Sequence, residues 1–519
     1  MLSSLDIFIV ALYAVTLFAL AQWVSREKPG HTKDATDYFL AGKSLPWWAI
    51  GASLIAANIS AEQIIGMSGS GYAIGLAIAS YEWMAAITLI LVGKYLLPVF
   101  LKTGIYTMPQ FLEQRYDHRV KTVMASFWMG VYVFVNLTSI LWLGALAINT
   151  VAGIDLTLGL ILLGIFAMSY SLYGGLKAVA LTDIVQVVLL VAGGLMIVAI
   201  LLEQISGGAG VMAGFVTLME RVPDRFDMIL AQDHPHYMSL PGVSVLIGGM
   251  WVMNVSYWGF NQYIIQRALA AKSVKEAQKG IAFAAFLKLL MPVIVVLPGI
   301  AMYALNAELA TPDQAYPSAM ALLPAGIKGL VFAALLAAIV SSLASMCNSI
   351  STIFTVDLLP SMVSEQWLDR HRLASGRGTA LIAMMIAMMT AQPLLGNFDQ
   401  AFQYIQEFTG FFTPGIVAIF LLGMFWRQTT ATGALLAAVG SAVLSLAMKL
   451  LLPTLPFIDR VGLVFLLCVV IAVVWSLLRP QPQPGYIEPS GVSFVTSTGF
   501  NAAGIVVSCM LAFFYSTWW

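Results

Sequence analysis

Long apolar runs alternate with short polar segments along the whole chain. A helix that crosses a bilayer needs about 20 mostly apolar residues. The pattern therefore predicts an all-α polytopic membrane protein, with residues 1–519 forming a single transmembrane domain. A window of that length predicts fourteen transmembrane helices, near residues 5–24, 46–70, 73–101, 122–150, 156–173, 178–203, 241–264, 280–305, 327–356, 378–396, 400–424, 431–452, 461–478 and 497–519.

Composition excludes a water-soluble protein. Hydrophobic residues make up 60% of the chain and charged residues 10%, and the mean hydropathy is +0.89. An ordinary soluble domain carries about 25% charged residues, which it needs to cover its surface. The charges of the 25 basic and 25 acidic residues cancel. The chain therefore lacks the excess of positive charge that would indicate a nucleic acid partner. The expected surroundings are a lipid bilayer.

The basic residues indicate how the chain is oriented. When successive loops are assigned to opposite sides, eighteen of the 25 basic residues fall on one side and five on the other. The remaining two, Lys94 and Lys288, lie inside predicted spans. The positive-inside rule places the richer side in the cytoplasm. Both termini are therefore expected outside the cell.

Two charged residues are predicted near the middle of the bilayer. Glu82 lies about nine residues from the outer end of its span, and Lys288 lies at a similar depth from the inner end of another. A charge at this depth is costly and needs a partner or a function. One interpretation is a structural pair, or a lysine that reaches the interface with its long stem. The other is a polar cavity where both groups face a ligand.

Polar runs interrupt the second and the seventh span. The second contains Asn58, Ser60, Glu62 and Gln63 in close succession, and the seventh contains the run 254–261. Such stretches favour a helix that is broken halfway, with freed carbonyl groups that line a cavity. These spans begin two sets of five spans, 46–203 and 241–424. Because five is an odd number, the second set must enter the membrane from the opposite face. The pattern predicts an inverted-repeat transporter, with 5–24 and 431–519 as peripheral helices.

Two further spans carry candidate ligand groups. In the ninth, the hydroxyls of Ser341 and Ser342 and the carbonyl of Ala338 form a compact group of neutral oxygens. They would suit a sodium ion, although serine often serves only to pack membrane helices together. In the eleventh, Phe402 and Gln406 are four residues apart and share one helix face. An amide beside an aromatic ring suits a hydroxyl-rich ligand; the alternative is a hydrogen bond between helices.

Three sequence motifs resemble those of a known family. They are the run from Tyr38 to Trp48 (YFLAGKSLPWW), the run from Tyr170 to Leu176 (YSLYGGL), and the pair Thr182-Asp183. The chain is similar to the sodium/solute symporter family, and within it to the sodium/sugar branch, especially the sodium/galactose transporters of bacteria. The resemblance extends from about residue 5 to the C-terminus.

The resemblance implies fourteen helices with a leucine-transporter-type core of five plus five inverted helices. It implies that sodium drives the uptake of a galactose- or glucose-type sugar across the bacterial inner membrane by alternating access, without a cofactor.

Residues carried over from the matching motifs fall into four groups. The sugar contacts would be Asn58, Gln63, Glu82, Asn254, Lys288 and Gln406. The gates would be Met67, Tyr81 and Phe402 outside, and Tyr257 with Trp258 inside. The sodium ligands would be the carbonyls of Ala56, Ile59 and Ala338 and the hydroxyls of Ser341 and Ser342. Asp183 would lie near the exit route of the ion.

One departure from that pattern concerns the sugar site. The resemblance implies a serine among the sugar contacts at the position where this chain has Ala85, so one hydroxyl contact would be missing. Alternatives to a sugar symporter are a symporter of the same family for another nutrient and an uncoupled sugar uniporter. An enzyme would need a nucleophile–base group or paired metal ligands inside the membrane, and all five histidines fall outside the predicted spans. The sequence does not determine whether the protein forms a homo-oligomer.

Overall fold

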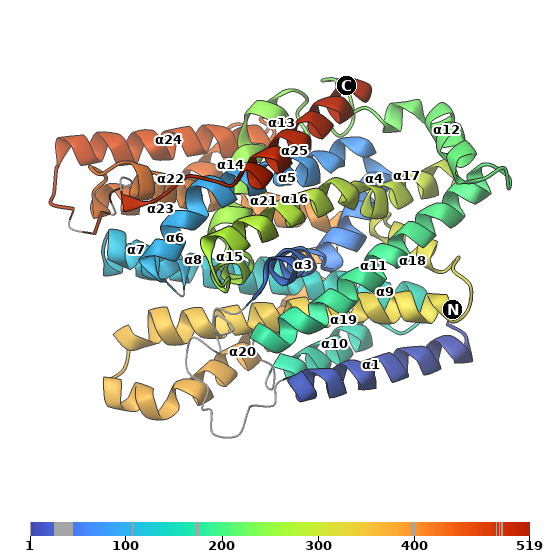
Figure 1. Cartoon of the computed structure of the whole chain (residues 1–519), viewed down its shortest axis with the longest axis horizontal. Coiled ribbons are helices and arrows are strands. Elements are labelled where there is room, and N and C mark those ends of the chain that lie inside the picture. Colours follow the sequence, from blue (N-terminus) through green and yellow to red (C-terminus); the bar gives the residue numbers. More distant parts are fainter. Residues whose placement is uncertain are drawn as a thin grey trace.

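The computed structural model describes residues 2–24, 45–105, 107–171, 176–396, 400–483, 485–486, 488 and 491–519. Within these ranges the protein is built of helices, and its only β-type pairing is an isolated bridge between Leu45 and Ala271. Figure 1 shows the helices as a bundle in which α1 lies at one edge and α24 at the opposite edge. The motif residues 38–44 and 172–175 lie outside the described ranges.

The α-helices of the described part are α1 (Ser4–Val24), α3 (Trp47–Asn58), α4 (Met67–Ala73), α5 (Ser80–Leu91), α6 (Leu97–Thr103), α7 (Met108–Arg115), α8 (His118–Val131), α9 (Thr138–Ala152), α10 (Leu156–Ser171), α11 (Leu176–Ile205), α12 (Val211–Arg221), α13 (Ser244–Ile247), α14 (Gly249–Val255), α15 (Gln262–Leu269), α16 (Val274–Val295), α17 (Leu297–Ala304), α18 (Ala315–Met320), α19 (Ile327–Thr352), α20 (Glu365–Leu395), α21 (Ala401–Thr409), α22 (Thr413–Phe425), α23 (Ala431–Leu451), α24 (Phe457–Leu478) and α25 (Thr498–Thr517).

Many of these helices are long and apolar enough to cross a membrane. Among the described residues, nine helices meet that requirement, and the number rises to eleven if each of two bent helix pairs counts as one span. The predicted spans 5–24 and 156–173 coincide with α1 and α10, whose apolar parts are shorter. The protein is therefore a multi-pass membrane protein. The total of fourteen spans stays a prediction.

The second predicted span is broken at the place where its polar residues gather. Helix α3 ends at Asn58, a π-helical turn η2 (Glu62–Gly66) and α4 follow, and the two halves are bent by 63°. The Ser60 amide donates to the Asn58 carbonyl at 2.8 Å, and the Gln63 and Ile64 amides both donate to the Ser60 carbonyl at 3.2 and 3.0 Å. The Ser60 and Gln63 amides thus turn away from the carbonyls of Ala56 and Ile59, their partners in a regular helix, whereas the Ile64 amide keeps its regular partner.

Small residues let the broken span approach its neighbours closely. A Cβ atom added to Gly51 of α3 would lie 2.6 Å from the Gly280 carbonyl of α16. One added to Gly299 of α17 would lie 2.0 Å from the Ser68 carbonyl of α4. Both distances are far shorter than a van der Waals contact, so only glycine fits. Each half of the broken span is therefore packed against one part of the eighth predicted span.

Four further π-helical turns distort other helices of the described part. They are η4 (Val92–Leu96) between α5 and α6, η5 (Tyr132–Leu137) between α8 and α9, η7 (Ser256–Phe260) after α14, and η9 (Ile353–Leu358) after α19. After η7 the backbone at Asn261 becomes extended before α15 begins. The seventh predicted span is thus interrupted within its polar run 254–261. Such turns commonly occur at functional sites because they change the direction of neighbouring side chains.

Candidate functional site

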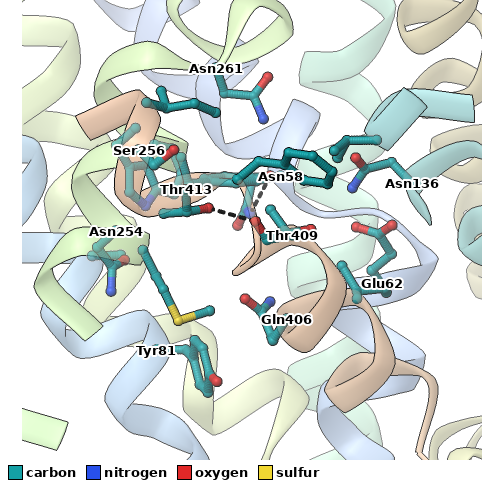
Figure 2. Close-up of a pocket in the computed structure, with 18 of the residues that line it drawn as sticks. Asn58, Glu62, Tyr81, Asn136, Asn254, Ser256, Asn261, Gln406, Thr409 and Thr413 are labelled. Carbon is teal, nitrogen blue, oxygen red and sulfur yellow. Dashed lines mark hydrogen bonds between the residues drawn. The ribbon is translucent and has the colours of Figure 1, made fainter. Parts of the chain in front are cut away.

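A cavity in the centre of the bundle collects polar side chains from helices that are far apart in the sequence. It is bordered by α3 with η2, by α5, by α8 with η5, by α14 with η7, by α16, and by α21 with α22 (Figure 2). Its polar lining residues include Asn58, Glu62, Gln63, Tyr81, Glu82, Asn136, Asn254, Ser256, Tyr257, Asn261, Lys288, Gln406, Thr409 and Thr413. Six of these are the predicted sugar contacts.

Glu82 and Lys288 form a buried ion pair inside this cavity. Lys288 Nζ lies 2.5 Å from Glu82 Oε2, and the exposed fractions of the two side chains are 0% and 3%. The ammonium therefore does not reach the membrane interface. It also donates to Asn58 Oδ1 and lies 4.9 Å above the ring of Trp258. The pair joins α5 to α16. Because it is buried, the loss of either partner would leave an uncompensated charge inside the protein.

Amide side chains extend the ion pair into a network. The Gln63 amide donates to Glu82 Oε1 and also contacts the sulfur of Met67 at 3.2 Å. Together with Asn58 and Lys288, this gives four polar side chains from three predicted spans in direct contact. Carboxylate, amide and ammonium groups supply both donors and acceptors. The network could therefore exchange hydrogen bonds with the hydroxyls of a ligand.

Asn254, Gln406 and Ala85 also line the cavity, from three different helices. The Asn254 amide donates to the Met250 carbonyl one turn earlier at 3.1 Å. Gln406 is on α21, and Figure 2 shows its side chain directed toward the cavity. The structure therefore brings together all six side chains that the sequence proposes as sugar contacts.

Aromatic residues border the cavity at two places. The rings of Tyr81 and Phe402 meet edge to face with centroids 5.1 Å apart. The rings of Tyr257 and Trp258 are 5.2 Å apart, and the Tyr257 hydroxyl contacts Asn58 Nδ2 at 3.1 Å and the Tyr263 hydroxyl at 2.7 Å. Figure 2 shows Tyr81 and Asn261 at opposite ends of the cavity. Met67 is fully buried and lies outside the cavity lining.

Four of the five residues predicted to bind sodium lie on two helices that contact each other, α3 and α19, and Ile59 directly follows α3. Ala56, Ile59, Ala338, Ser341 and Ser342 are all buried. The break after Asn58 diverts backbone donors from the carbonyls of Ala56 and Ile59, so the α3 side offers two oxygens. The α19 side contributes the hydroxyls of two adjacent serines. These groups are neutral, and a monovalent cation such as sodium needs little net charge from its ligands.

Several residues near the site were not singled out from the sequence. Asn136 lies on the π-helical turn η5 and lines the cavity beside Glu62 (Figure 2). Its signal is an isolated amide in the apolar run 131–137.

Arg267, at the end of the seventh predicted span, is buried and donates to Ser53 of α3 at 3.0 Å and to Ser345 of α19 at 3.5 Å. It therefore joins the two helices of the predicted sodium site. The side chain of Asp183 lies outside the part of the chain that the structure describes.

A multi-pass helical bundle with a broken span and a buried polar cavity has the fold of a membrane transporter. A solved structure of a substrate-bound, outward-open Na+-coupled sialic acid symporter has this fold, with a TM-score of 0.79, 22% identity and coverage of 93% of this chain and 99% of that chain. A nucleobase-cation-symport-1 family transporter in a closed conformation gives a TM-score of 0.54 at 14% identity and covers 91% and 99%.

Comparison with known sequences identifies the family. The model of the sodium:solute symporter family matches residues 38–440. A sodium/glucose cotransporter of Vibrio parahaemolyticus is 51% identical over 537 residues, which cover 100% of this chain and 99% of that protein. A sodium/myo-inositol cotransporter of Homo sapiens is 32% identical and covers 97% of this chain and 73% of that protein. The chain belongs to the sodium:solute symporter family, whose members are transporters rather than enzymes.

Proposed function

We propose that the protein imports a monosaccharide of the galactose or glucose type together with sodium, across the bacterial inner membrane and by alternating access. The observation that carries this proposal is the buried network of Asn58, Lys288, Glu82 and Gln63 that borders the central cavity. The 51% identical Vibrio protein that is named a sodium/glucose cotransporter supports the sugar class.

The proposed architecture has fourteen spans, with both termini outside. Spans 2–6 (46–203) and 7–11 (241–424) would form two inverted five-helix repeats, and 5–24 with 431–519 would lie at the periphery. The broken second span and the interrupted seventh span support this arrangement, since each begins one repeat. The positions of α1 and α24 at opposite edges of the bundle agree with a peripheral role (Figure 1).

In the proposed site the sugar contacts are Asn58, Gln63, Glu82, Asn254, Lys288 and Gln406. Each sugar hydroxyl would replace one contact in the present network, so a missing or inverted hydroxyl would leave a buried polar group unpaired. An unpaired group of this kind costs about 1–3 kcal/mol, which is enough to distinguish epimers. The ring of Tyr257, helped by Trp258, would stack on the sugar and close the inner side. Tyr81, Phe402 and Met67 would close the outer side.

Sodium would bind to the oxygens of Ala56, Ile59, Ala338, Ser341 and Ser342, between α3 and α19. It would hold α3 in place and thereby keep Asn58 and Gln63 in position for the sugar. Each ligand then raises the affinity for the other by the same factor. Inward opening would separate the two helices, release sodium by a route that passes Asp183, and free the sugar past Tyr257. Net movement of positive charge makes transport electrogenic, at about 2.3 kcal/mol per charge for each 100 mV.

The deciding experiment is uptake of radiolabelled D-galactose and D-glucose into proteoliposomes with a sodium or a potassium gradient. Sugar uptake that requires sodium and is accelerated by an inside-negative potential is the expected result. Equal uptake in potassium would instead indicate a uniporter. No uptake of either sugar, with sodium-dependent uptake of another nutrient, would indicate a symporter of different specificity. myo-Inositol belongs in the panel because relatives named sodium/myo-inositol cotransporters are 31–32% identical.

A further inference from the structure

Two cations from the peripheral helices converge on one carboxylate beside the cavity. Glu407 is near the end of α21, Lys449 is on α23 and Arg460 is on α24. Glu407 Oε1 lies 2.8 Å from Lys449 Nζ and 3.0 Å from Arg460 Nη2. The exposed fractions of the side chains are 39% for Lys449 and 6% for Arg460. The pair with Arg460 is therefore the less screened of the two.

The same two cations also lie over the aromatic residues of the bend that follows α21. Lys449 Nζ is 5.4 Å from the ring centroid of Phe408 and 5.8 Å from that of Phe411, and the guanidinium of Arg460 is 5.8 Å from Phe411. At this bend α21 and α22 meet at 46°. Contacts between cations and ring faces add to the ion pairs at this distance. Lys449 of α23 and Arg460 of α24 thus both contact the bend between α21 and α22.

Helix α21 needs such support for two physical reasons. It has nine residues, and a helix of that length is unstable unless tertiary contacts hold it. Glu407 lies in its last turn, where no basic residue of the helix itself is present and where the helix dipole disfavours a negative charge. Cations from α23 and α24 supply the missing compensation. Helix α21 also packs against η2, η5 and α9. Through these ion pairs its direction depends in addition on α23 and α24, which contribute no residue to the cavity.

The direction of α21 in turn sets the position of two cavity residues. Gln406 directly precedes Glu407, and successive side chains point about 100° apart around a helix. Gln406 faces the cavity and Phe402 lies one turn earlier on the same side, whereas Glu407 faces the peripheral helices. Any rotation of α21 about its axis would move Gln406 and Phe402 together, away from their present partners.

We propose that Arg460 and Lys449 are positioning residues for sugar binding: by fixing Glu407 and the bend after α21, they direct Gln406 and Phe402 toward the sugar. This inference rests on the proposed sugar transport. It assigns the peripheral helices α23 and α24 a part in substrate affinity, with the sodium oxygens on α3 and α19 unaffected.

The test compares Arg460→Gln, Glu407→Gln and the double variant in proteoliposomes with radiolabelled D-glucose and D-galactose. Arg460→Gln is expected to raise the KM for sugar about tenfold at saturating sodium, with kcat and the sodium concentration for half-maximal uptake nearly unchanged. The double variant is expected to be no worse than Glu407→Gln alone, because the two residues act as one unit. Lys449→Gln, which removes the more exposed pair, should raise the KM about twofold.

Glu488→Gln is the matched control, since it removes an ion pair with Arg427 in which both side chains are exposed, 61% and 71%. It should leave the sugar KM unchanged. An unchanged KM in Arg460→Gln, or an equal loss of sugar and sodium affinity with a lower melting temperature, would overturn the positioning role. If the wild-type protein transports neither sugar while it still imports another nutrient with sodium, the proposed sugar specificity fails instead, and that outcome is visible before any variant is made.

Discussion

The central cavity and the group of oxygens between α3 and α19 solve the same problem of polarity inside a membrane in different ways. The cavity contains a full ion pair, Glu82 with Lys288, surrounded by amides. The proposed ion ligands of the second region are neutral carbonyl and hydroxyl oxygens, among them those of Ile59 and Ser342. The first therefore depends on mutual neutralisation of two charges, and the second on a break in the helix that frees backbone groups.

This difference indicates how tolerant each region should be of substitution. A buried charge that loses its partner is penalised by about 3–5 kcal/mol, whereas a lost neutral hydroxyl costs about 1 kcal/mol. The ion pair should therefore respond to single changes in an all-or-none manner. The oxygen group should respond in a graded manner, because each oxygen supplies only a fraction of the binding of an ion.

The largest effect is expected from Lys288→Ala. It removes the cation from Glu82, whose side chain is 3% exposed, and leaves the carboxylate without its partner. Sugar uptake should be abolished, which we define as a fall of more than about 100-fold, and the melting temperature in detergent should fall. Adding Glu82→Ala should restore the melting temperature without restoring uptake. Normal sugar uptake in Lys288→Ala would exclude the ion pair from the site.

Ser342→Ala is expected to have the next largest effect, on sodium alone. The variant removes one neutral oxygen from the proposed ion site on α19. The sodium concentration for half-maximal uptake should rise about tenfold, which corresponds to about 1.4 kcal/mol, with little change in sugar KM at saturating sodium. The control is Ser349→Ala, at a buried serine two turns further along the same helix. It should leave the sodium concentration for half-maximal uptake unchanged. Unchanged sodium activation in Ser342→Ala would refute the ion site.

Tyr257→Phe tests whether the ring or the hydroxyl matters at the inner side of the cavity. The substitution removes contacts of 3.1 Å to Asn58 and 2.7 Å to Tyr263 but keeps the ring beside Trp258. If stacking dominates, uptake should fall only about two- to fivefold, as expected for about 1 kcal/mol. Tyr257→Ala should fall much further. A complete loss of uptake in Tyr257→Phe would contradict stacking as the main role of this residue.

The smallest effect is expected from Ala85→Ser, which sharpens the comparison within the cavity itself. Ala85 lines the cavity on α5, one turn from Glu82. A serine would add a hydroxyl at this position, and it should shift the ratio of KM values for galactose and glucose by a few-fold, since a single hydroxyl contact is worth about 1 kcal/mol. Uptake of both sugars by the same liposome preparation provides the control. Identical KM values before and after the substitution would show that this position does not face the sugar.

The interruption of the second span was predictable from its residues because polar side chains there compete with a continuous apolar helix. The structure has α3 end at Asn58, within the predicted polar run. The partners of Glu407 were not predictable in the same way. Lys449 and Arg460 lie 42 and 53 positions further along the chain, and their sequence pattern is that of ordinary basic residues at helix ends. Likewise, no hydropathy signal marks the π-helical turn that places Asn136 at the cavity.

The amino-acid sequence by itself determined that the chain lies in a membrane, where its long apolar segments fall and where one of them must break. These properties depend on the transfer of each segment from water to lipid, which is a local sum over neighbouring residues. Only the tertiary structure decided that Lys288 meets Glu82 and Asn58, 206 and 230 positions away, and that the peripheral helices hold α21. Such contacts depend on how separate helices pack, and packing is a property of the assembled bundle rather than of any one segment.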